Sequence, residues 1–257
     1  MTTSDTTPDS EDVVGTQVQV LTGSVQRLAT LVESMDPDQL RQPAYPSEWK
    51  ISDVLSHLGS GAVIHRLRLE GTDQEMQPIW DEWNAKDPDQ QASDALQADR
   101  DLMERLKSLS AEDRARHFAL GPMNLDLASF LSLRVNEHLL HTWDVAVAQD
   151  PAATLPGDAA AAALGTMAMV AGFTGKPTGS ERTVIVRTTD PTRQLEVSLK
   201  PDAVTVSSVD PTGTPDLEMP TEAFIRLLSG RLDPDHSPAI ADPDSHLDEL
   251  RRVFPGF

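Results

Sequence analysis

One long segment, residues 125–148, contains neither proline nor glycine and constrains the fold more than any other part of the chain. Its apolar residues and its length predict a central helix. On that helix Glu137 and His141 lie four residues apart, so their side chains leave the same face one turn apart. Arg134 and Asp144 extend this polar stripe in either direction. Because a carboxylate and an imidazole among apolar residues need a partner, a divalent metal is the obvious candidate.

Three further amphipathic segments predict three more helices. Apolar residues recur at alternating spacings of three and four along residues 14–35. The second helix begins near Ile51, with Ser47 or Ser52 as its cap, and the third spans residues 93–109. Together with the central helix they form a four-helix bundle, in which four apolar stripes are buried against one another. Metal sites in such bundles are built from side chains on facing helices.

His57 lies on the second predicted helix, at the border of its apolar stripe. A lone histidine at such a place is usually a boundary residue. Together with Glu137 and His141, however, it makes a set of two histidines and one carboxylate. Such a set holds zinc or ferrous iron in enzymes and leaves coordination positions open for water or substrate. The alternative interpretation is a buried ion pair without a metal.

Three neighbouring residues on the same predicted helix have other roles in this interpretation. His138 points about 100° away from Glu137 around the helix, so it should face a neighbouring helix or solvent. Arg134 lies one turn before Glu137 and either hydrogen-bonds its carboxylate or forms an ordinary salt bridge. Asp144 is a candidate to hold the imidazole of His141 in one tautomer.

The acidic segment from Gly71 to Asp89 carries Trp80, Trp83 and two prolines. It is interpreted as a long loop. Long loops in compact domains often act as lids or binding loops, so this segment is a candidate to close over the site.

The sequence pattern changes after a linker at residues 151–156. An alanine-rich helix is expected within residues 159–175, followed by strands at residues 183–187, 195–199 and 203–206. Two helices follow, at residues 221–228 with Thr221 as a cap, and at residues 245–254. This pattern predicts an α+β fold class with two domains: a helical bundle at residues 12–150 and a small α+β domain at residues 151–257.

Charge and composition narrow the possible partners. The formal net charge of -20 would repel nucleic acid and anionic membrane surfaces, although it is also explained by solubility alone. The chain has no cysteine, so any thiol chemistry needs a thiol from outside. Residues 1–12 suit a disordered tail and lack the features of a signal peptide, and no segment is apolar enough to span a membrane. We therefore expect a cytoplasmic monomer or homodimer that acts on small molecules.

Two motifs surround the candidate ligands. The first is Trp49-Lys50-Ile51-Ser52-Asp53-Val54-Leu55-Ser56-His57-Leu58, and the second is Arg134-x-x-Glu137-x-x-x-His141-x-Trp143-Asp144. Together they resemble the mycothiol-dependent maleylpyruvate isomerase family. That resemblance implies a DinB-like four-helix bundle with His57, Glu137 and His141 as metal ligands. Family members usually begin the first motif with Gly-Trp-Ser or Gly-Trp-Thr, whereas this chain has Glu48-Trp49-Lys50 and so lacks the expected cap.

The resemblance extends over nearly the whole chain. The C-terminal part resembles the family's small domain, which is similar to sterol carrier proteins, and Leu227-Leu228-Ser229-Gly230-Arg231 resembles its Leu-Leu-x-Gly-Arg stretch. Arg231 is therefore the candidate catalytic arginine; the alternative is a surface or domain-interface residue. The cofactors that the resemblance implies are a divalent metal, with zinc expected first, and mycothiol as the external thiol.

The implied reaction is the cis–trans isomerisation of a maleylpyruvate-like unsaturated acid by addition and elimination of a thiolate. One alternative is a mycothiol S-transferase that acts on an electrophilic metabolite. Another is a non-catalytic protein that binds a metal and a small ligand. A metal-dependent hydrolase is also compatible with the ligand set, although no residue points specifically to it.

Overall fold

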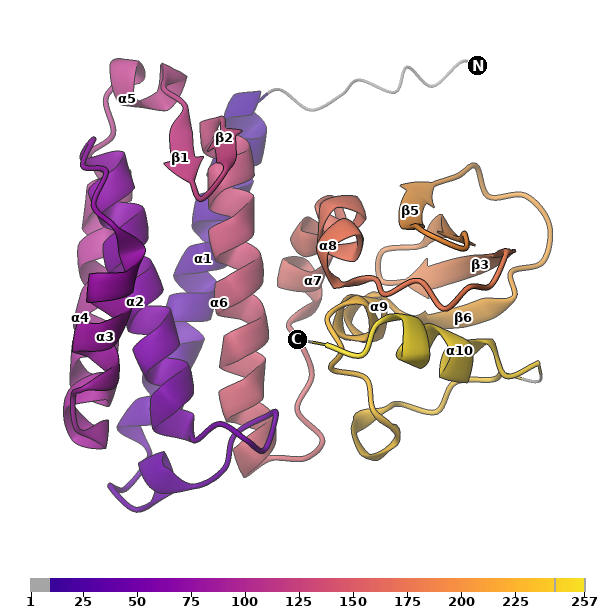
Figure 1. Ribbon diagram of the computed structural model, residues 1–257, viewed down its shortest axis with the longest axis horizontal. Coiled ribbons are helices and arrows are strands. Elements are labelled where there is room, and N and C mark those ends of the chain that lie inside the picture. The colour runs from indigo at the N-terminus through magenta and orange to yellow at the C-terminus, as the bar shows by residue number, and fades with distance from the viewer. Residues whose placement is uncertain (1–9, 243, 257) are drawn as a thin grey trace. The chain divides into compact units, whose positions relative to one another are not determined.

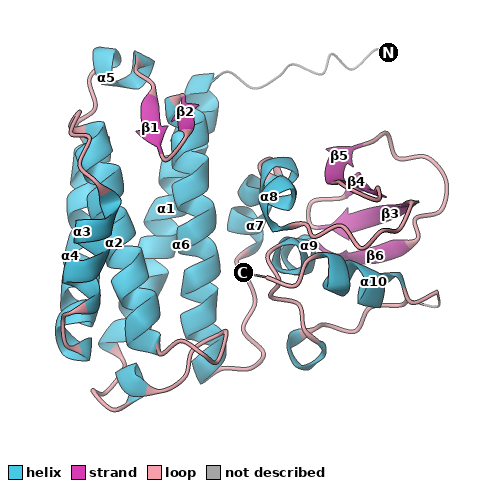
Figure 2. Cartoon of the chain, viewed as in Figure 1, coloured by secondary structure: helices cyan, strands magenta, loops and turns pink. Residues whose placement is uncertain are grey.

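The computed structural model describes residues 10–242 and 244–256. The chain divides into two compact units, Met1–Ala153 and Thr154–Phe257. The first is helical, and the second combines a four-stranded sheet with short helices (Figures 1 and 2). This architecture confirms the expected α+β class, with a four-helix bundle followed by a small α+β domain. Of the predicted disordered tail, residues 1–9 lie outside the described residues, and residues 10–12 belong to the first helix.

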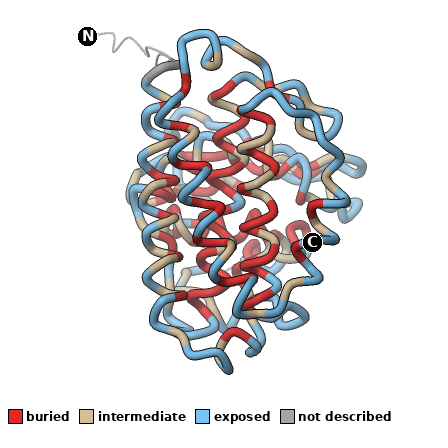
Figure 3. The backbone as a smooth tube through the Cα atoms, turned by 90° about the vertical axis from the view of Figure 1, so that its left-hand side faces the viewer, coloured by how far each residue is buried: buried red, intermediate tan, exposed pale blue. Residues whose placement is uncertain are grey.

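Four long helices form the N-terminal unit. They are α1 (Ser10–Glu33), α2 (Ile51–Leu69), α4 (Pro88–Lys107) and α6 (Leu127–Gln149). The most extensive packing is between α2 and α4 and between α1 and α6, and α2 also packs on α6. Buried residues follow the inner sides of these helices (Figure 3). The periodic apolar residues therefore form one core, and α2 and α6 are brought side by side.

Aspartate side chains, and not serine side chains, accept the hydrogen bonds at the N-termini of α2, α4 and α6. The Asp87 carboxylate accepts a hydrogen bond at the start of α4, and the Asp126 carboxylate accepts one from the Ser129 amide at 2.8 Å at the start of α6. The α2 helix begins after Lys50, whose amide donates to the Asp53 carboxylate at 2.8 Å. The predicted caps Ser47 and Ser52 were wrong, because Asp53 satisfies this end from inside the helix.

The interpretation of residues 71–89 as a long loop was also wrong. Helix α3 occupies Met76–Asn84, and α4 already begins at Pro88. The prolines that suggested a loop lie in the first turns of these helices, where the missing amide breaks no hydrogen bond. Trp83 is buried against Gly59 of α2, where a Cβ atom would lie 2.2 Å from its ring. This segment is therefore a packed part of the bundle.

Four smaller elements complete the N-terminal unit, and the sequence reading did not anticipate them. They are η1 (Gln39–Arg41), α5 (Ala111–Ala115), β1 (Phe118–Leu120) and β2 (Met123–Leu125). The two short strands pair antiparallel and lead into α6. No helix of the described residues is long and apolar enough to cross a membrane.

The C-terminal unit is built on a sheet with the strand order β5-β4-β3-β6. The strands are β3 (Arg182–Thr189), β4 (Arg193–Leu199), β5 (Val204–Ser208) and β6 (Leu217–Pro220). The first three correspond to the predicted strands, whereas β6 was missed because it is short and ends in proline. It pairs parallel with β3, and the other pairs are antiparallel.

The helices of this unit are short. They are α7 (Gly157–Leu164), α8 (Met167–Thr174), α9 (Thr221–Leu228), η2 (Pro234–His236) and α10 (His246–Val253). The predicted single alanine-rich helix is in fact α7 and α8, which are separated at Gly165 and Thr166. Thr221 is the first residue of α9 and not its cap, because its hydroxyl donates to the Thr189 carbonyl at 2.7 Å.

Gly230 ends α9 in a left-handed conformation, with φ of 68°. A Cβ atom at this position would lie 2.2 Å from the backbone of Gly256. Glycine is favoured after a helix C-terminus for its access to positive φ, and here the close approach of a second backbone adds a further requirement. The backbone of this unit therefore explains why the Leu-Leu-Ser-Gly-Arg stretch has glycine at position 230.

Candidate metal centre

The three side chains that the sequence singled out lie together on the N-terminal unit. His57 comes from α2, and Glu137 and His141 come from α6. His57 Nε2 is 2.8 Å from Glu137 Oε2, and His141 Nε2 is 3.6 Å from the same oxygen. One ligand atom from each residue falls within 4.8 Å of the other two. The packing of α2 on α6 thus converts two distant sequence motifs into one cluster of donor atoms.

The position of each residue at the border of its apolar stripe explains why the cluster reaches solvent. His57 lies between the buried residues Ser56 and Leu58 on α2. The side chains of His57 and Glu137 are 38% and 48% exposed, whereas that of His141 is 13% exposed. A small molecule can therefore approach the cluster without separation of the helices.

Glu137 is held in its anionic form. Partial desolvation by the surrounding helices tends to raise the pKa of its carboxyl group. Hydrogen bonds with His141 and His57, and the charges of these two side chains, outweigh that tendency and hold the pKa well below its usual value. The carboxylate is thus in the protonation state in which it can bind a cation at neutral pH.

Asp144 orients one of the imidazoles. Its side chain is completely buried, and its Oδ2 atom lies 2.8 Å from His141 Nδ1. A carboxylate in this position accepts a hydrogen bond from the Nδ1–H group, which directs Nε2 toward Glu137 and leaves Nε2 as the atom that would bind a metal. The arrangement matches the role predicted for Asp144, and carboxylate–histidine pairs of this kind commonly support metal ligands.

Trp49 lies against both candidate histidine ligands. Its ring is parallel to that of His141, with 5.9 Å between centroids, and edge-on to that of His57 at 5.6 Å. It is also one of two large hydrophobic side chains that are exposed among the described residues. Trp143, by contrast, is buried and donates from its indole nitrogen to the Ala153 carbonyl at 2.8 Å. Trp49 therefore lines the candidate site, and Trp143 serves packing.

Arg134 does not support Glu137 directly. Its Nη2 atom donates to Asp99 Oδ1 at 2.8 Å and to the Leu58 carbonyl at 3.0 Å. Of the two alternatives predicted for Arg134, the ordinary salt bridge is confirmed and the hydrogen bond to Glu137 is not, because Arg134 turns inward to a carboxylate on α4. His138 also faces inward, as one of the two predicted orientations, and its Nε2 donates to Asp99 Oδ2 at 2.9 Å.

Asp99 is the residue that the sequence analysis missed. Its signal is present in the α4 sequence, where it stands among apolar residues at helical spacing. The buried apolar residues of this stripe are Ala95, Leu96, Leu102, Met103 and Leu106. A charged residue on an apolar stripe needs a buried partner, and a search for unpaired charges in predicted core positions would have found it.

Arg231 lies in the C-terminal unit, just after α9. It is buried, and its Nη1 atom donates to the Ser229 carbonyl at 3.0 Å. Its assignment as a catalytic residue stays a prediction.

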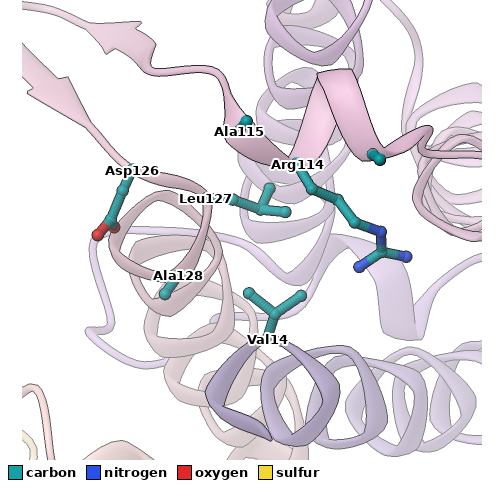
Figure 4. A pocket seen from close by; sticks show the side chains of 7 residues that line it. Val14, Arg114, Ala115, Asp126, Leu127 and Ala128 are labelled. Carbon is teal, nitrogen blue, oxygen red and sulfur yellow. The ribbon is translucent and has the colours of Figure 1, made fainter. Parts of the chain in front are cut away.

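A pocket of about 290 Å³ lies where α1, α5 and the beginning of α6 meet (Figure 4). It is lined by Val14, Ala111, Arg114, Ala115, Asp126, Leu127 and Ala128. None of the predicted site residues is among them. Leu127 and Glu137 are ten residues apart on one helix, which corresponds to about 15 Å along its axis. The pocket is therefore separate from the candidate metal centre.

The fold and the cluster define a class: a helical bundle with two histidines and one carboxylate that face each other from two helices. The family model described as the mycothiol maleylpyruvate isomerase N-terminal domain matches residues 21–146, which cover most of this bundle. Residues 21–146 therefore belong to the N-terminal domain of the mycothiol maleylpyruvate isomerase family, as the two motifs predicted.

A solved enzyme structure and that of its mutant have a similar fold. The crystal structure of the mycothiol-dependent maleylpyruvate isomerase is 12% identical, with a TM-score of 0.63 over 90% of this chain and 93% of that chain. A histidine-to-alanine mutant of that enzyme gives the same values. YfiT from Bacillus subtilis, described as a probable metal-dependent hydrolase, is 18% identical over 58% of this chain and 93% of its own, with a TM-score of 0.46. No curated protein sequence matches the chain.

Proposed function

We propose that this protein is a metal-dependent enzyme that uses an external thiol, mycothiol, to isomerise a maleylpyruvate-like unsaturated acid from cis to trans. The observation that carries the proposal is the convergence of His57, Glu137 and His141, with one donor atom from each within 4.8 Å of the others. Membership of the family supports the thiol and the reaction type. The absence of cysteine means that the thiol must come from outside the chain.

The donor atoms fit a divalent metal. In tetrahedral zinc sites with bonds of about 2.0–2.2 Å, neighbouring ligand atoms lie about 3.4 Å apart. The distances from Glu137 Oε2 to the two histidine nitrogens, 2.8 and 3.6 Å, lie on either side of that value. Small side-chain rotations would therefore accommodate zinc or ferrous iron. Three protein ligands leave a coordination position open. When bound, the metal would supply the Lewis acidity that lowers the pKa of a thiol.

The isomerisation can be written with all bonds balanced. The thiolate sulfur adds to one carbon of the cis double bond, and the π electrons move onto the conjugated carbonyl oxygen as an enolate. The former double bond is now single, so it rotates. The enolate electrons then re-form the double bond in the trans geometry and expel the thiolate, so no thiol is consumed.

The residues of this chain have distinct tasks in that scheme. Asp144 holds the Nδ1 proton of His141 and so fixes the direction of its Nε2 atom. Trp49 covers the ring of His141 and narrows the approach to the site. Arg231 is our candidate to bind a substrate carboxylate through its guanidinium, because that group matches a carboxylate in two parallel hydrogen bonds. The resemblance of the Leu-Leu-Ser-Gly-Arg stretch to the family supports this last assignment.

The test is a product assay with the full chain, loaded with zinc, in the presence and absence of mycothiol. We expect the trans isomer to form only when both zinc and mycothiol are present, with the amount of free thiol unchanged. Consumption of thiol in proportion to product would identify an S-transferase instead of an isomerase. Failure to bind either zinc or mycothiol, with no product, would overturn the proposal and leave a binding protein of another kind.

A further inference from the structure

A second set of ionisable side chains lies behind the candidate metal centre, in the interior of the bundle. Asp99, Arg134 and His138 form this set, which we call the Asp99 cluster. None of the three is more than 2% exposed. One oxygen of the Asp99 carboxylate accepts a hydrogen bond from Arg134 at 2.8 Å, and the other accepts one from His138 at 2.9 Å. Because desolvation of buried charges offsets much of their attraction, stability alone is a weak reason for such a cluster.

The charge state of Asp99 depends on these two partners. Burial by itself would raise the pKa of the carboxyl group, but His138 and Arg134 outweigh burial and lower it. The anion therefore persists in the core as long as both donors are in place. Removal of the carboxylate would take away the acceptor of the His138 Nε2–H group and one of the two acceptors of Arg134 Nη2.

The cluster is positioned to fix the rotation of α6. Arg134 and His138 lie four residues apart and face α4, whereas Glu137 and His141, also four residues apart, face α2. A rotation of α6 by about 20° would move ligand atoms roughly 6 Å from the helix axis by about 2 Å. Metal sites tolerate deviations of only about 0.2 Å in their bond lengths. Contacts that hold Arg134 and His138 in place therefore also hold Glu137 and His141 in position.

Arg134 also links this face of α6 to the helix that carries the third candidate ligand. Its Nη2 atom donates to the Leu58 carbonyl at 3.0 Å, and Leu58 directly follows His57. A Cβ atom on Gly61, one turn further along α2, would lie 2.8 Å from Arg134 Nη1. Glycine at this position leaves the space that the guanidinium occupies between the two helices.

The fourth helix joins through His138. Its Nδ1 atom lies 2.7 Å from Ser24 Oγ on α1 and 3.2 Å from Thr142 Oγ1 on α6. With its Nε2 atom on Asp99, the imidazole is held from both sides. Side chains or carbonyls from α1, α2, α4 and α6 thus meet in one hydrogen-bonded network next to the candidate ligands.

We propose that Asp99 is a positioning residue for the candidate metal centre: through Arg134 and His138 it fixes the rotation of α6, and with it the geometry of Glu137 and His141 relative to His57. The proposal rests on the proposed function, because it assumes that these three residues bind a metal. Asp99 itself lies on a helix that contributes no ligand.

The test compares metal binding in three variants. Asp99→Leu removes both acceptor oxygens of the carboxylate. Asp99→Asn keeps the shape of the side chain; its amide can accept a hydrogen bond from Arg134 and donate one to a neutral His138. Leu102→Ala, one turn away on α4 and equally buried, is the control for loss of stability without loss of the network. The Kd for Zn(II) is measured by competition with a chelator, the visible spectrum is recorded with Co(II), and Tm is recorded for each metal-free protein.

We expect Asp99→Leu to weaken Zn(II) binding roughly 10- to 100-fold and to change the Co(II) spectrum, as loss of supporting groups does at other metal sites. Asp99→Asn should stay within about threefold of the unsubstituted protein. Leu102→Ala should bind the metal normally even where its Tm is reduced as much as that of Asp99→Leu. Equal Kd values and spectra for all folded variants would overturn the proposal.

A fourth variant tests the proposal in the case in which Asp99→Leu does not fold. Gly61→Ala places a methyl group against the Arg134 guanidinium and leaves Asp99 and the three candidate ligands unchanged. It should weaken Zn(II) binding by about tenfold, and an unchanged Kd would count against the proposal. If the unsubstituted protein binds neither metal, the proposed function fails first; if it binds and the variants match it, only the positioning role fails.

Discussion

Replacement of Glu137 by alanine is expected to reduce the affinity for Zn(II) by more than about 100-fold, because loss of a direct ligand exceeds the 10- to 100-fold effect of losing a supporting group. Glu137 is the only anionic member of the three candidate ligands, and its oxygen is close to both histidine nitrogens. Without it, two neutral imidazoles would have to hold a divalent cation. His57→Ala should have a comparable effect, since it removes the only ligand from α2.

The measurement is the metal content after equilibrium dialysis, read by elemental analysis, together with the Zn(II) Kd. Glu104→Ala is the matched control: it removes a glutamate from the exposed surface of the same unit, where Glu104 pairs with Lys107 at 2.9 Å. The control should bind one equivalent of metal per chain. Unchanged stoichiometry in both Glu137→Ala and His57→Ala would show that the metal, if any, binds elsewhere.

The second large effect concerns the dependence of stability on pH and comes from His65. This side chain is buried against the ring of Phe130, with 4.7 Å between centroids. Burial, followed by the nearby charge of Arg134, lowers its pKa from 6.5 to about 4, although a hydrogen bond to the Gly61 carbonyl acts in the opposite direction. His65 is therefore neutral in the folded protein at pH values at which it is protonated in the unfolded chain.

The sign of the effect follows from proton binding. Between pH 6.5 and pH 4 the unfolded chain binds a proton at His65 and the folded protein does not, so the free energy of unfolding falls as the pH falls. A pKa that drops from 6.5 to about 4 on folding corresponds to a loss of about 3 kcal/mol across this range. Above pH 6.5 the contribution of His65 is constant, and below pH 4 the loss is complete.

Urea unfolding at a series of pH values tests this expectation, with His65→Leu as the comparison. Leucine fills a similar space beside Phe130 and cannot bind a proton, so the variant should lose about 3 kcal/mol less than the unsubstituted protein between pH 6.5 and pH 4. Other groups that titrate in this range are shared by both proteins and cancel in the difference. Parallel stability curves for the two proteins would contradict a neutral, buried His65.

The sequence predicted the bundle and the three candidate ligands because both depend on local spacing. Apolar residues at helical spacing placed the four long helices, and the spacing of Glu137 and His141 put them on one face. The approach of His57 to these two residues could not be predicted in the same way, because it depends on which helices pack together. The resemblance to a family supplied this expectation, which the spacing of residues within one helix cannot provide.

The errors arose where the partner of a residue is set by tertiary packing. A hydrogen bond to Glu137, one turn away on the same helix, was one of the two alternatives for Arg134, but the structure pairs Arg134 in a salt bridge with Asp99 from α4. Residues 71–89 were interpreted as a loop because prolines were treated as breaks, although prolines are accepted in the first turn of a helix. In both cases local sequence allowed two structures, and contacts with other helices selected one.

The orientation of Trp49 gives this protein an optical probe at its candidate site. An indole that lies parallel to one imidazole and edge-on to another, with part of its surface in solvent, is close enough for a paramagnetic ion held by those imidazoles to quench its fluorescence. Metal occupancy of the candidate site can therefore be followed by the intrinsic tryptophan fluorescence of the protein. The fluorescence of Trp49→Phe separates the signal of Trp49 from that of the other tryptophans.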